Sequence, residues 1–533
     1  MNPTTDLTLT EDLVTTMTER MATLTRTLST WMLEQPHTLA EVEQHVVRLL
    51  KELGATLVAG LCSLAAPADP APSIACSCGH QAAYLRQRPA QVTTLLGPIH
   101  IWRSYYLCAE CGVGQHPLDA QLQFCAGSRS AALDELLALL GATQDSFVQA
   151  AQVLERLTLV HVSANTVRDA TLQLGTLLQS HQDPPHAEPA PSLPACPSAT
   201  PCPSRLYITM DGVLAHLHER GWSELKAGCC YQTRSRVART RPERVEIRAH
   251  SASYVTALEQ AQSFGWRLWE EALRRGVLSS EEVVVLGDGA HWIWTIAQRH
   301  FPRAIQILDW YHASEYVWNA ASAIWGEASP ERASWAQAQL DKLWESKVQA
   351  VLLELELWRE RGEAVEAALS YYTEHQGRMD YALYRARGMQ IGSGNVESAC
   401  KQLVSRRLKQ AGMIWGAGGA EAVATVRAWL KSERWEEAMG LRGVRSRSYR
   451  RAQAEQEREG SEAEGIAVEE RGRAVVAAQG QAGRQELTAE VLGQVRAELA
   501  EQRGKNVWRR AGSAKRQEQQ AAHRDEPRPA IAA

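Results

Sequence analysis

The sequence lacks an excess of charge of either sign. Its 533 residues include 57 Lys and Arg against 61 Asp and Glu, which gives a formal net charge of −4. This balance excludes proteins that coat nucleic acid through overall positive charge. With 45% hydrophobic and 22% charged residues, the composition also excludes a fibrous or wholly disordered chain. A chain of this length has room for about three domains.

Long apolar runs and an export signal are also missing. The first 14 residues carry acidic and hydroxyl side chains where a secretory signal has a basic start and an apolar stretch. The most apolar region, 49–66, contains Lys51 and Glu52 and falls short of the ~20 residues that a membrane span needs. We therefore expect a cytoplasmic protein without membrane contacts. In that compartment, the 11 cysteines favour metal ligands or core thiols over disulfide bonds.

Apolar spacing and composition divide the chain into six regions. Helical spacing, interrupted at Gln35-Pro36, is followed by paired cysteines and then by a return of helical spacing. A proline-rich stretch is typical of a linker, and the tail is expected to be helical or disordered because it has few large apolar residues. The regions are a helical N-terminal region (1–70), a cysteine-containing module (71–120), a helical region (121–180), a linker (181–204), an α/β domain (205–435) and a charged tail (436–533).

The order of elements in the α/β domain is specific. Periodicity predicts three consecutive strands, a helix, a strand, a helix and a strand. The segments are 206–210, 224–231, 244–249, 253–275, 283–286, 291–300 and 304–308. This is the order of the ribonuclease H-like fold. Helical periodicity over 313–388 then predicts an all-α insertion in that fold.

Acidic residues follow the apolar runs of this domain. Asp211 and Asp288 each come directly after a predicted strand, where side chains line the crevice of an α/β sheet, and Glu397 begins a later helix. Mg²⁺ needs only one or two protein carboxylates, and two ions bridged by Asp211 would stabilise both the attacking and the leaving oxygen in phosphoryl transfer. Taken singly, either aspartate could be a turn residue and Glu397 a capping residue.

Three blocks around these acids resemble the acidic motifs of bacterial insertion-sequence DDE transposases of the Mutator-like branch. The blocks are Tyr207–Gly212, Gly287–Ile293 and Ser393–Lys401. The resemblance covers roughly residues 119–435. It implies a ribonuclease H-like catalytic core in which Asp211, Asp288 and Glu397 bind Mg²⁺ or Mn²⁺. We expect two ions, with Asp211 as the carboxylate that bridges them.

The same resemblance implies a DNA transposase that binds terminal inverted repeats, cleaves DNA strands and transfers the freed 3′-hydroxyl to target DNA. We expect a nucleoid-associated homo-oligomer on double-stranded DNA. The family's Asp-x-x-His signature matches Asp309 and His312, which we expect beside the site rather than as primary ligands. Two alternatives stay open: a catalytically inactive DNA-binding regulator, and a ribonuclease H-like nuclease that transfers no strand.

Two cysteine pairs flank a predicted hairpin in the second region. Cys76 and Cys78 precede it, and Cys108 and Cys111 follow it. Two thiolate pairs, each followed by glycine, can converge on one tetrahedral Zn²⁺ and replace the core that a small module lacks. We expect a zinc ribbon with a structural ion. Because this chain has Cys-x-Cys where a ribbon has Cys-x-x-Cys, His80 could replace one of the first two thiolates.

Three segments are candidates for DNA contact. Residues 146–169 have the spacing of a helix-turn-helix, although an ordinary helical hairpin is the alternative. Residues 231–248 hold six arginines against two glutamates, and 398–415 hold four basic residues and no acid. Either basic segment could contact phosphates or be a solvated surface. The predicted contacts are Asn165, Arg168, Arg234, Arg236, Arg239, Lys401, Arg406, Arg407 and Lys409.

Overall fold

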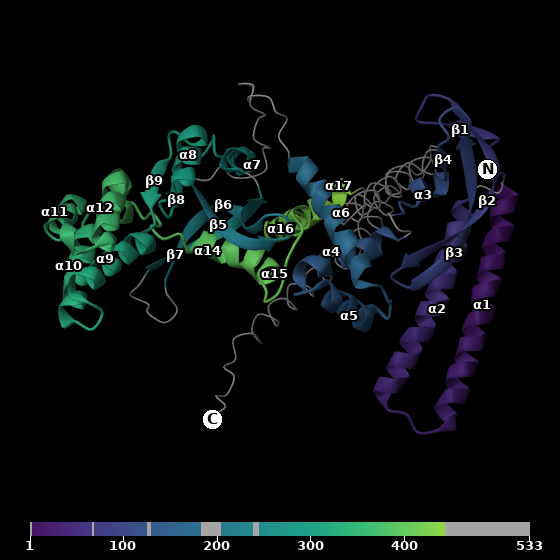
Figure 1. Cartoon of the computed structure of the whole chain (residues 1–533). Coiled ribbons are helices and arrows are strands. Elements are labelled where there is room, and N and C mark those ends of the chain that lie inside the picture. The colour runs from purple at the N-terminus through teal and green to yellow at the C-terminus, as the bar shows by residue number, and fades with distance from the viewer. Residues whose placement is uncertain are drawn as a thin grey trace, which may run out of the picture. The chain divides into compact units, whose positions relative to one another are not determined.

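The computed structural model describes six stretches of the chain (Figure 1). They are residues 3–66, 69–124, 129–182, 204–237, 245–258 and 260–442. Most of the predicted linker and tail lies outside the described residues, as do Arg239 and the side chain of Arg236. Within the described residues, no helix is long and apolar enough to cross a membrane.

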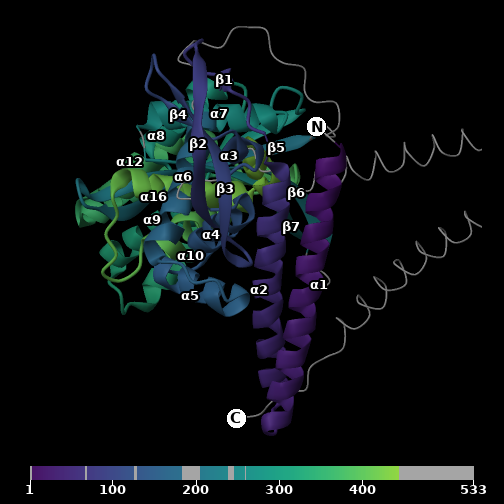
Figure 2. The same cartoon turned by 90° about the vertical axis from the view of Figure 1, so that its right-hand side faces the viewer.

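A helical hairpin begins the described chain. Helices α1 (Pro3–Glu34) and α2 (Leu39–Ala65) run side by side (Figure 2). The break between them follows from Pro36 and from a capping box. The Thr38 hydroxyl accepts the backbone N–H of Glu41 at 3.3 Å, and the Glu41 carboxylate accepts the backbone N–H of Thr38 at 2.8 Å. These bonds satisfy two N–H groups that the first turn of α2 would otherwise leave unpaired.

The cysteine-containing module is a four-stranded antiparallel sheet whose strands lie in chain order. The strands are β1 (Ser73–Ala75), β2 (Gln81–Thr94), β3 (Gly97–Cys108) and β4 (Gly114–Gln115). The predicted hairpin is confirmed, because β2 and β3 pair from Ala82 opposite Cys108 to Thr94 opposite Gly97. Gly97 has φ +113°, which favours glycine at this turn. Small and branched side chains of α2, including Val58, pack on Val92 and Ile99 of the hairpin.

Four helices follow the module. They are α3 (Pro117–Gln121), α4 (Ala131–Thr143), α5 (Phe147–Thr158) and α6 (Ala164–Gln182). The Ser146 hydroxyl caps α5 by accepting the N–H of Gln149 at 3.0 Å, and the Ser163 hydroxyl caps α6 by accepting the N–H of Thr166 at 3.1 Å. Leu159 ends α5 in a left-handed conformation, with φ 54°. Two capped helices joined by this short turn occupy the segment for which a helix-turn-helix was predicted.

The α/β domain contains a five-stranded mixed sheet of order β7-β6-β5-β8-β9. The strands are β5 (Arg205–Leu217), β6 (Gly221–Val237), β7 (Val245–Ala257), β8 (Glu282–Gly287) and β9 (Ile305–Leu308). β6 pairs antiparallel with both β5 and β7, whereas β5, β8 and β9 are parallel to one another. Parallel pairing brings the residues that follow β8 and β9 to the same edge of the sheet.

The prediction of a helix beginning at Ser253 is wrong. Strand β7 continues through Ala257, which lies opposite Lys226 of β6, and α7 begins only at Ala261. The β-branched pair Val255 and Thr256 favours a strand, and both side chains are buried.

Helices surround the sheet and fill the predicted insertion. They are α7 (Ala261–Arg274), α8 (His291–His300), α9 (Trp310–Trp325), α10 (Pro330–Trp344), α11 (Val348–Leu357), α12 (Glu363–His375) and α13 (Tyr381–Ala386). Side chains from α9 to α13 join those of β5, β8 and β9 in one hydrophobic core. The last described helices are α14 (Gly394–Cys400), a π-helical turn η3 (Lys401–Ser405), α15 (Arg406–Leu408), α16 (Ala417–Lys431) and α17 (Trp435–Leu441).

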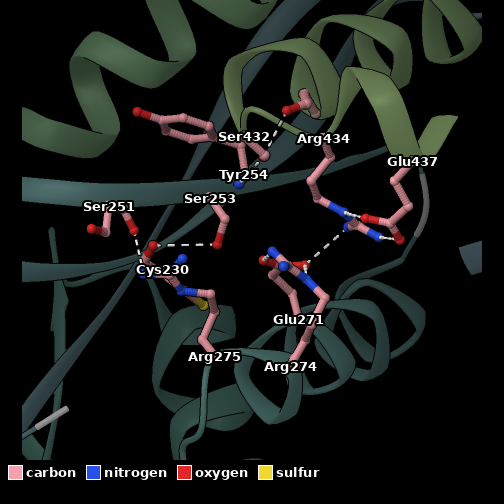
Figure 3. A network of polar contacts seen from close by, with 11 residues as sticks. Cys230, Ser251, Ser253, Tyr254, Glu271, Arg274, Arg275, Ser432, Arg434 and Glu437 are labelled. Carbon is pink, nitrogen blue, oxygen red and sulfur yellow. Dashed lines mark hydrogen bonds and ion pairs between the residues drawn. The ribbon is translucent and has the colours of Figure 1, made fainter. Parts of the chain in front are cut away.

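A polar network fastens the turn between α16 and α17 to the sheet (Figure 3). The buried Glu271 of α7 accepts hydrogen bonds from Arg274 at 2.9 Å and from Arg434 at 3.3 Å. Arg434 also contacts Glu437, and the Ser432 hydroxyl accepts the backbone N–H of Tyr254 at 2.8 Å. A buried carboxylate is tolerated here because two guanidinium groups satisfy it.

Helix α6 packs directly on α16 of the α/β domain. Leu174 and Leu178 share a core with Val426 and Trp429, so the predicted linker does not separate two independent cores. The close approach depends on Gly175, because a Cβ there would lie 2.6 Å from the carbonyl carbon of Ala422.

Replacing Gly175 by Ala should therefore force α6 away from α16. We expect a loss of about 1–3 kcal/mol in the free energy of unfolding, measured by chemical denaturation. Gly418→Ala is the matched control, because Gly418 is exposed on α16 and a Cβ there meets no atom within 4 Å. That substitution should be neutral or stabilise by up to about 1 kcal/mol. Equal effects of the two substitutions would contradict the packing described.

Candidate functional site

Asp211 lies within β5, and Asp288 directly follows the adjacent parallel strand β8. The register pairs Thr209 of β5 with Leu286 of β8, and each aspartate comes two residues after its member of that pair. Strand β5 continues to Leu217, so the prediction that Asp211 directly follows a strand is wrong. Burial raises the pKa of Asp211, and the negative charge of Asp288 raises it further.

Both aspartates also order their own backbone. A carboxylate oxygen of Asp211 accepts the N–H of Gly212 at 2.6 Å, and one of Asp288 accepts the N–H of Ala290 at 2.9 Å. The second bond closes the turn between β8 and α8. The turn-residue alternative therefore describes Asp288, whereas Asp211 lies within a paired strand.

Asp309 is completely buried at the end of β9. One carboxylate oxygen accepts the backbone N–H of His312 at 2.8 Å and lies 3.1 Å from His312 Nδ1, while the other accepts the backbone N–H of Ser393. Burial opposes ionisation, but the hydrogen bonds from His312 and Ser393 lower the pKa of Asp309 overall. The hydrogen bond to Asp309 outweighs burial at His312 and raises its pKa to about 9. The pair is therefore an ion pair at neutral pH.

Glu397 lies in α14 with an exposed side chain. The Ser393 hydroxyl donates to its carboxylate at 3.0 Å. Ligand atoms of Asp309, His312 and Glu397 lie within 4.8 Å of one another, a spacing that a shared metal ion would fit once the ring of His312 is neutral. The structure thus brings Glu397 closest to the two residues that were expected beside the site.

Cys400 lies near both Asp211 and Glu397. It is buried one turn after Glu397, against Ala227 and Val213 of the sheet. Burial raises the pKa of Cys400, and the charges of Asp211 and Glu397 raise it further. Helix α14 therefore places Glu397 and Cys400 over the strand that carries Asp211.

Sequence reasoning missed three contributors, Ser393, Cys400 and Tyr371. Ser393 and Cys400 lie in the sequence block 393–401, which was identified by Glu397. Their position beside that glutamate was the sequence signal for them. The Tyr371 hydroxyl, from α12, donates to the backbone carbonyl of Asp288 at 2.6 Å across 83 residues of sequence, and no local pattern indicates that contact.

The donor set suits a divalent cation. It combines carboxylates with one imidazole, and the repulsion between Asp211 and Asp288 is the kind that a bound cation relieves. Mg²⁺ and Mn²⁺ prefer carboxylate oxygens. Among the described residues, Asp309 and Glu397 belong to one group that could hold an ion, and Asp211 and Asp288 are the other carboxylates of the site.

The four predicted cysteines converge at the other candidate metal centre. The sulfur of Cys76 lies 3.5 Å from that of Cys111, the sulfur of Cys78 lies 3.6 Å from that of Cys108, and all four lie within 4.8 Å of one another. A hydrogen bond from the Cys78 backbone lowers the pKa of Cys76 to about 6, against the effect of burial. Four such sulfurs could hold one zinc ion.

Glycines make both cysteine turns possible. Gly79 has φ +88° and Gly112 has φ +69°, directly after Cys78 and Cys111. His80 lies outside the four-sulfur group, with Nδ1 3.5 Å from the sulfur of Cys78. The Cys-x-Cys spacing therefore brings both thiols to the group without His80 as a substitute.

The family comparison covers both candidate centres. The model of an uncharacterised protein family, UPF0236, matches residues 32–438. The chain belongs to UPF0236. No curated protein matches the chain. The matched region extends from the end of α1 to α17 of this UPF0236 protein, so it includes the four cysteines and the acidic residues.

Most of the described DNA-contact candidates of this UPF0236 protein are exposed. Asn165 and Arg168 lie in the first turns of α6, where Arg168 pairs with Asp169 at 3.0 Å. The remaining exposed candidates are Arg234, Lys401, Arg406 and Lys409.

The prediction that Arg407 contacts DNA is wrong. Its side chain is 1% exposed, donates to the carbonyl of Gly141 at 3.2 Å and lies 4.5 Å over the ring of Phe147. Burial lowers the pKa of Arg407 to about 10, and the charge of Arg427 contributes. A run of basic residues in a sequence does not show which of the side chains is buried. Counting charges therefore wrongly predicted that Arg407 is exposed.

The Asp309–His312 pair predicts a pH dependence in metal-free buffer. Because the pKa of His312 is raised to about 9, its contribution to stability is complete below about pH 6.5 and is lost as the pH rises through 9. Because the pKa of Asp309 is lowered, its contribution is present above about pH 4 and is lost in more acidic solution. His312→Gln should thus reduce the free energy of unfolding more at pH 6 than at pH 10.

The control for this measurement is His161→Gln, at an exposed histidine of the turn before α6. Chemical denaturation should show no comparable pH-dependent difference for that variant. A His312→Gln effect of the same size at both pH values would contradict the ion pair.

Zinc content tests the cysteine centre. Purified full-length chain should carry one zinc ion, measured by elemental analysis, and Cys108→Ser should lose it and melt at a lower temperature because the metal replaces a core. Cys62→Ser, at a cysteine of α2 outside the four-sulfur group, should retain the metal. Zinc-free wild-type protein after expression with zinc would refute this assignment.

Proposed function

We propose that this UPF0236 protein is a DNA transposase that binds terminal inverted repeats, cleaves DNA strands in a metal-dependent reaction and transfers the 3′ ends to target DNA. The observation that carries the proposal is the convergence of acids from separate segments. Asp211 lies close enough to Asp288 for the charge of Asp288 to raise its pKa, and α14 packs Cys400, one turn after Glu397, on the sheet beside Val213 of the strand that carries Asp211.

The topology of the α/β domain supports this proposal. Three antiparallel strands followed by two parallel ones, with β5 at the centre, is the arrangement expected of a ribonuclease H-like core. Helices α9 to α13 come between β9 and the glutamate-bearing α14, where the resemblance implies a helical insertion.

In the proposed mechanism, Asp211, Asp288 and Glu397 would hold Mg²⁺ or Mn²⁺. Such ions, when bound, stabilise charge on the attacking and leaving oxygens of an in-line displacement. The remaining side chains position this set. Asp309 anchors the loop that opens α14, and the Ser393 hydroxyl orients the Glu397 carboxylate.

His312 would supply positive charge on the protein side of the site. Its Nδ1 lies against Asp309, and its raised pKa keeps the ring protonated at neutral pH. The Nε2–H is then the proton that the ring can offer to a phosphate oxygen of bound DNA.

The exposed basic residues supply contacts for DNA. Lys401, Arg406 and Lys409 follow Glu397 along the chain, so a phosphate backbone bound there would pass beside the acids. Asn165 and Arg168 occupy the part of α6 that corresponds to the start of a recognition helix. A structural zinc ion would stiffen the N-terminal module, and assembly into a homo-oligomer on DNA stays a prediction.

Three conservative substitutions test the proposal. Asp211→Asn, Asp288→Asn and Glu397→Gln should each reduce Mg²⁺-dependent cleavage of DNA that carries the repeats by about 100-fold or more, because each removes a charged ligand. Affinity for the uncut ends should change by less than about threefold. Glu366→Gln, at an exposed residue of α12, should cleave as wild type does.

The same assay separates the alternatives. A regulator would bind the ends without cutting them, and a nuclease would cut without joining. Full cleavage activity in any of the three carboxylate variants would remove that residue from the site.

A further inference from the structure

The hairpin of β2 and β3 is a two-stranded ribbon along most of its length. β1 pairs only with residues 81–83 of β2, and β4 pairs only with Tyr106 and Leu107 of β3. On one face of the ribbon, Val92, Ile99 and Ile101 are buried against α2. The ribbon is therefore supported from behind by a helix and held at one end by the cysteine group.

The opposite face of the ribbon is exposed. Register places Pro89 opposite Trp102 and Gln91 opposite His100, and residues opposite one another share a face. All four side chains are exposed, and Trp102 is 63% exposed. A large indole in open solvent beside amide and imidazole groups is a surface able to stack and to donate and accept hydrogen bonds.

The charge of the ribbon favours one class of partner. Residues 81–108 contain three arginines and no Asp or Glu, in a chain whose acids outnumber its bases. Arg103 is paired with Asp119 of α3, which leaves Arg86 and Arg88 as the arginines of the ribbon to consider. Arg86 is exposed, and Arg88 lies over the ring of Tyr105 at 3.7 Å. Both lie at the end of the ribbon nearer the cysteines, on the face opposite Trp102. A polyanion is thus the complementary partner.

We propose that the β2–β3 ribbon is a second DNA-binding element, which enters the major groove of the DNA ends with its exposed face. The groove of B-form DNA admits a two-stranded ribbon, and glutamine recognises adenine through two hydrogen bonds. In this arrangement Gln91 and His100 face base edges, and Trp102 packs on apolar base or sugar surface. Arg86 and Arg88 lie on the other face near the cysteine end, from which their long side chains would reach phosphates beside the groove. The inference rests on the proposed function for the identity of the DNA and adds a contact site separate from α6.

Binding of fluorescently labelled end DNA to full-length chain, without divalent metal, tests the ribbon. The double variant Gln91→Ala with Trp102→Ala should raise the dissociation constant about tenfold or more. Arg86→Gln with Arg88→Gln should weaken binding and reduce the slope of log affinity against log salt by about 1–2. Leu85→Ala is the matched control, because Leu85 is 53% exposed at the register shift of the same strand.

Zinc content and melting temperature identify any variant that fails to fold. Ribbon variants that fold and bind end DNA as wild type does would overturn the ribbon proposal alone. Altered sedimentation of these variants at unchanged DNA affinity would also overturn it, in favour of contact between copies of the chain. A wild-type chain that binds no end DNA would overturn the proposed function, and the ribbon proposal with it.

Discussion

The buried carboxylate of Asp309 is the contact on which the candidate site depends. It accepts the backbone N–H of His312 at the start of α9 and that of Ser393 before α14, which lie on either side of the helical insertion. Asp309 and Ser393 are 84 residues apart in the chain, so this contact fixes where the insertion returns to the sheet. A buried carboxylate is costly unless it is hydrogen-bonded. The loop before α14 is therefore held where the carboxylate is satisfied, and α14, which carries Glu397, begins there and packs on the strand that carries Asp211.

The order of strands and helices along the chain of the α/β domain could be predicted, because the central strands of its sheet are buried on both faces. Apolar runs at 206–210 and 283–286 have that character, and both are strands of the sheet. Strand ends were harder to place. Apolar content falls after Met210, yet pairing with β6 carries β5 on to Leu217. Similarly, Ser253 has no local strand signal, and its place in β7 follows from its partner Cys230.

The candidate site could be predicted only in part. Its acids stand out because carboxylates directly after apolar runs are conspicuous in a sequence. The contacts that orient them join residues far apart in the chain, such as Tyr371 with the backbone of Asp288, and no periodicity records them. The prediction for Arg407 failed for a different reason. Its charge favoured an exposed position, but the packing of α4 against the segment after Glu397 buries its side chain.

We propose that the acids around β5 perform strand transfer on DNA. To test this, the chain and Mg²⁺ are incubated with labelled DNA that carries the repeats flanking its own gene, together with a target plasmid. We expect labelled ends joined to the plasmid through their 3′-hydroxyls, and no joined product when the metal is omitted. End DNA that is bound but neither cut nor joined, with Mg²⁺ or with Mn²⁺, would contradict this proposal.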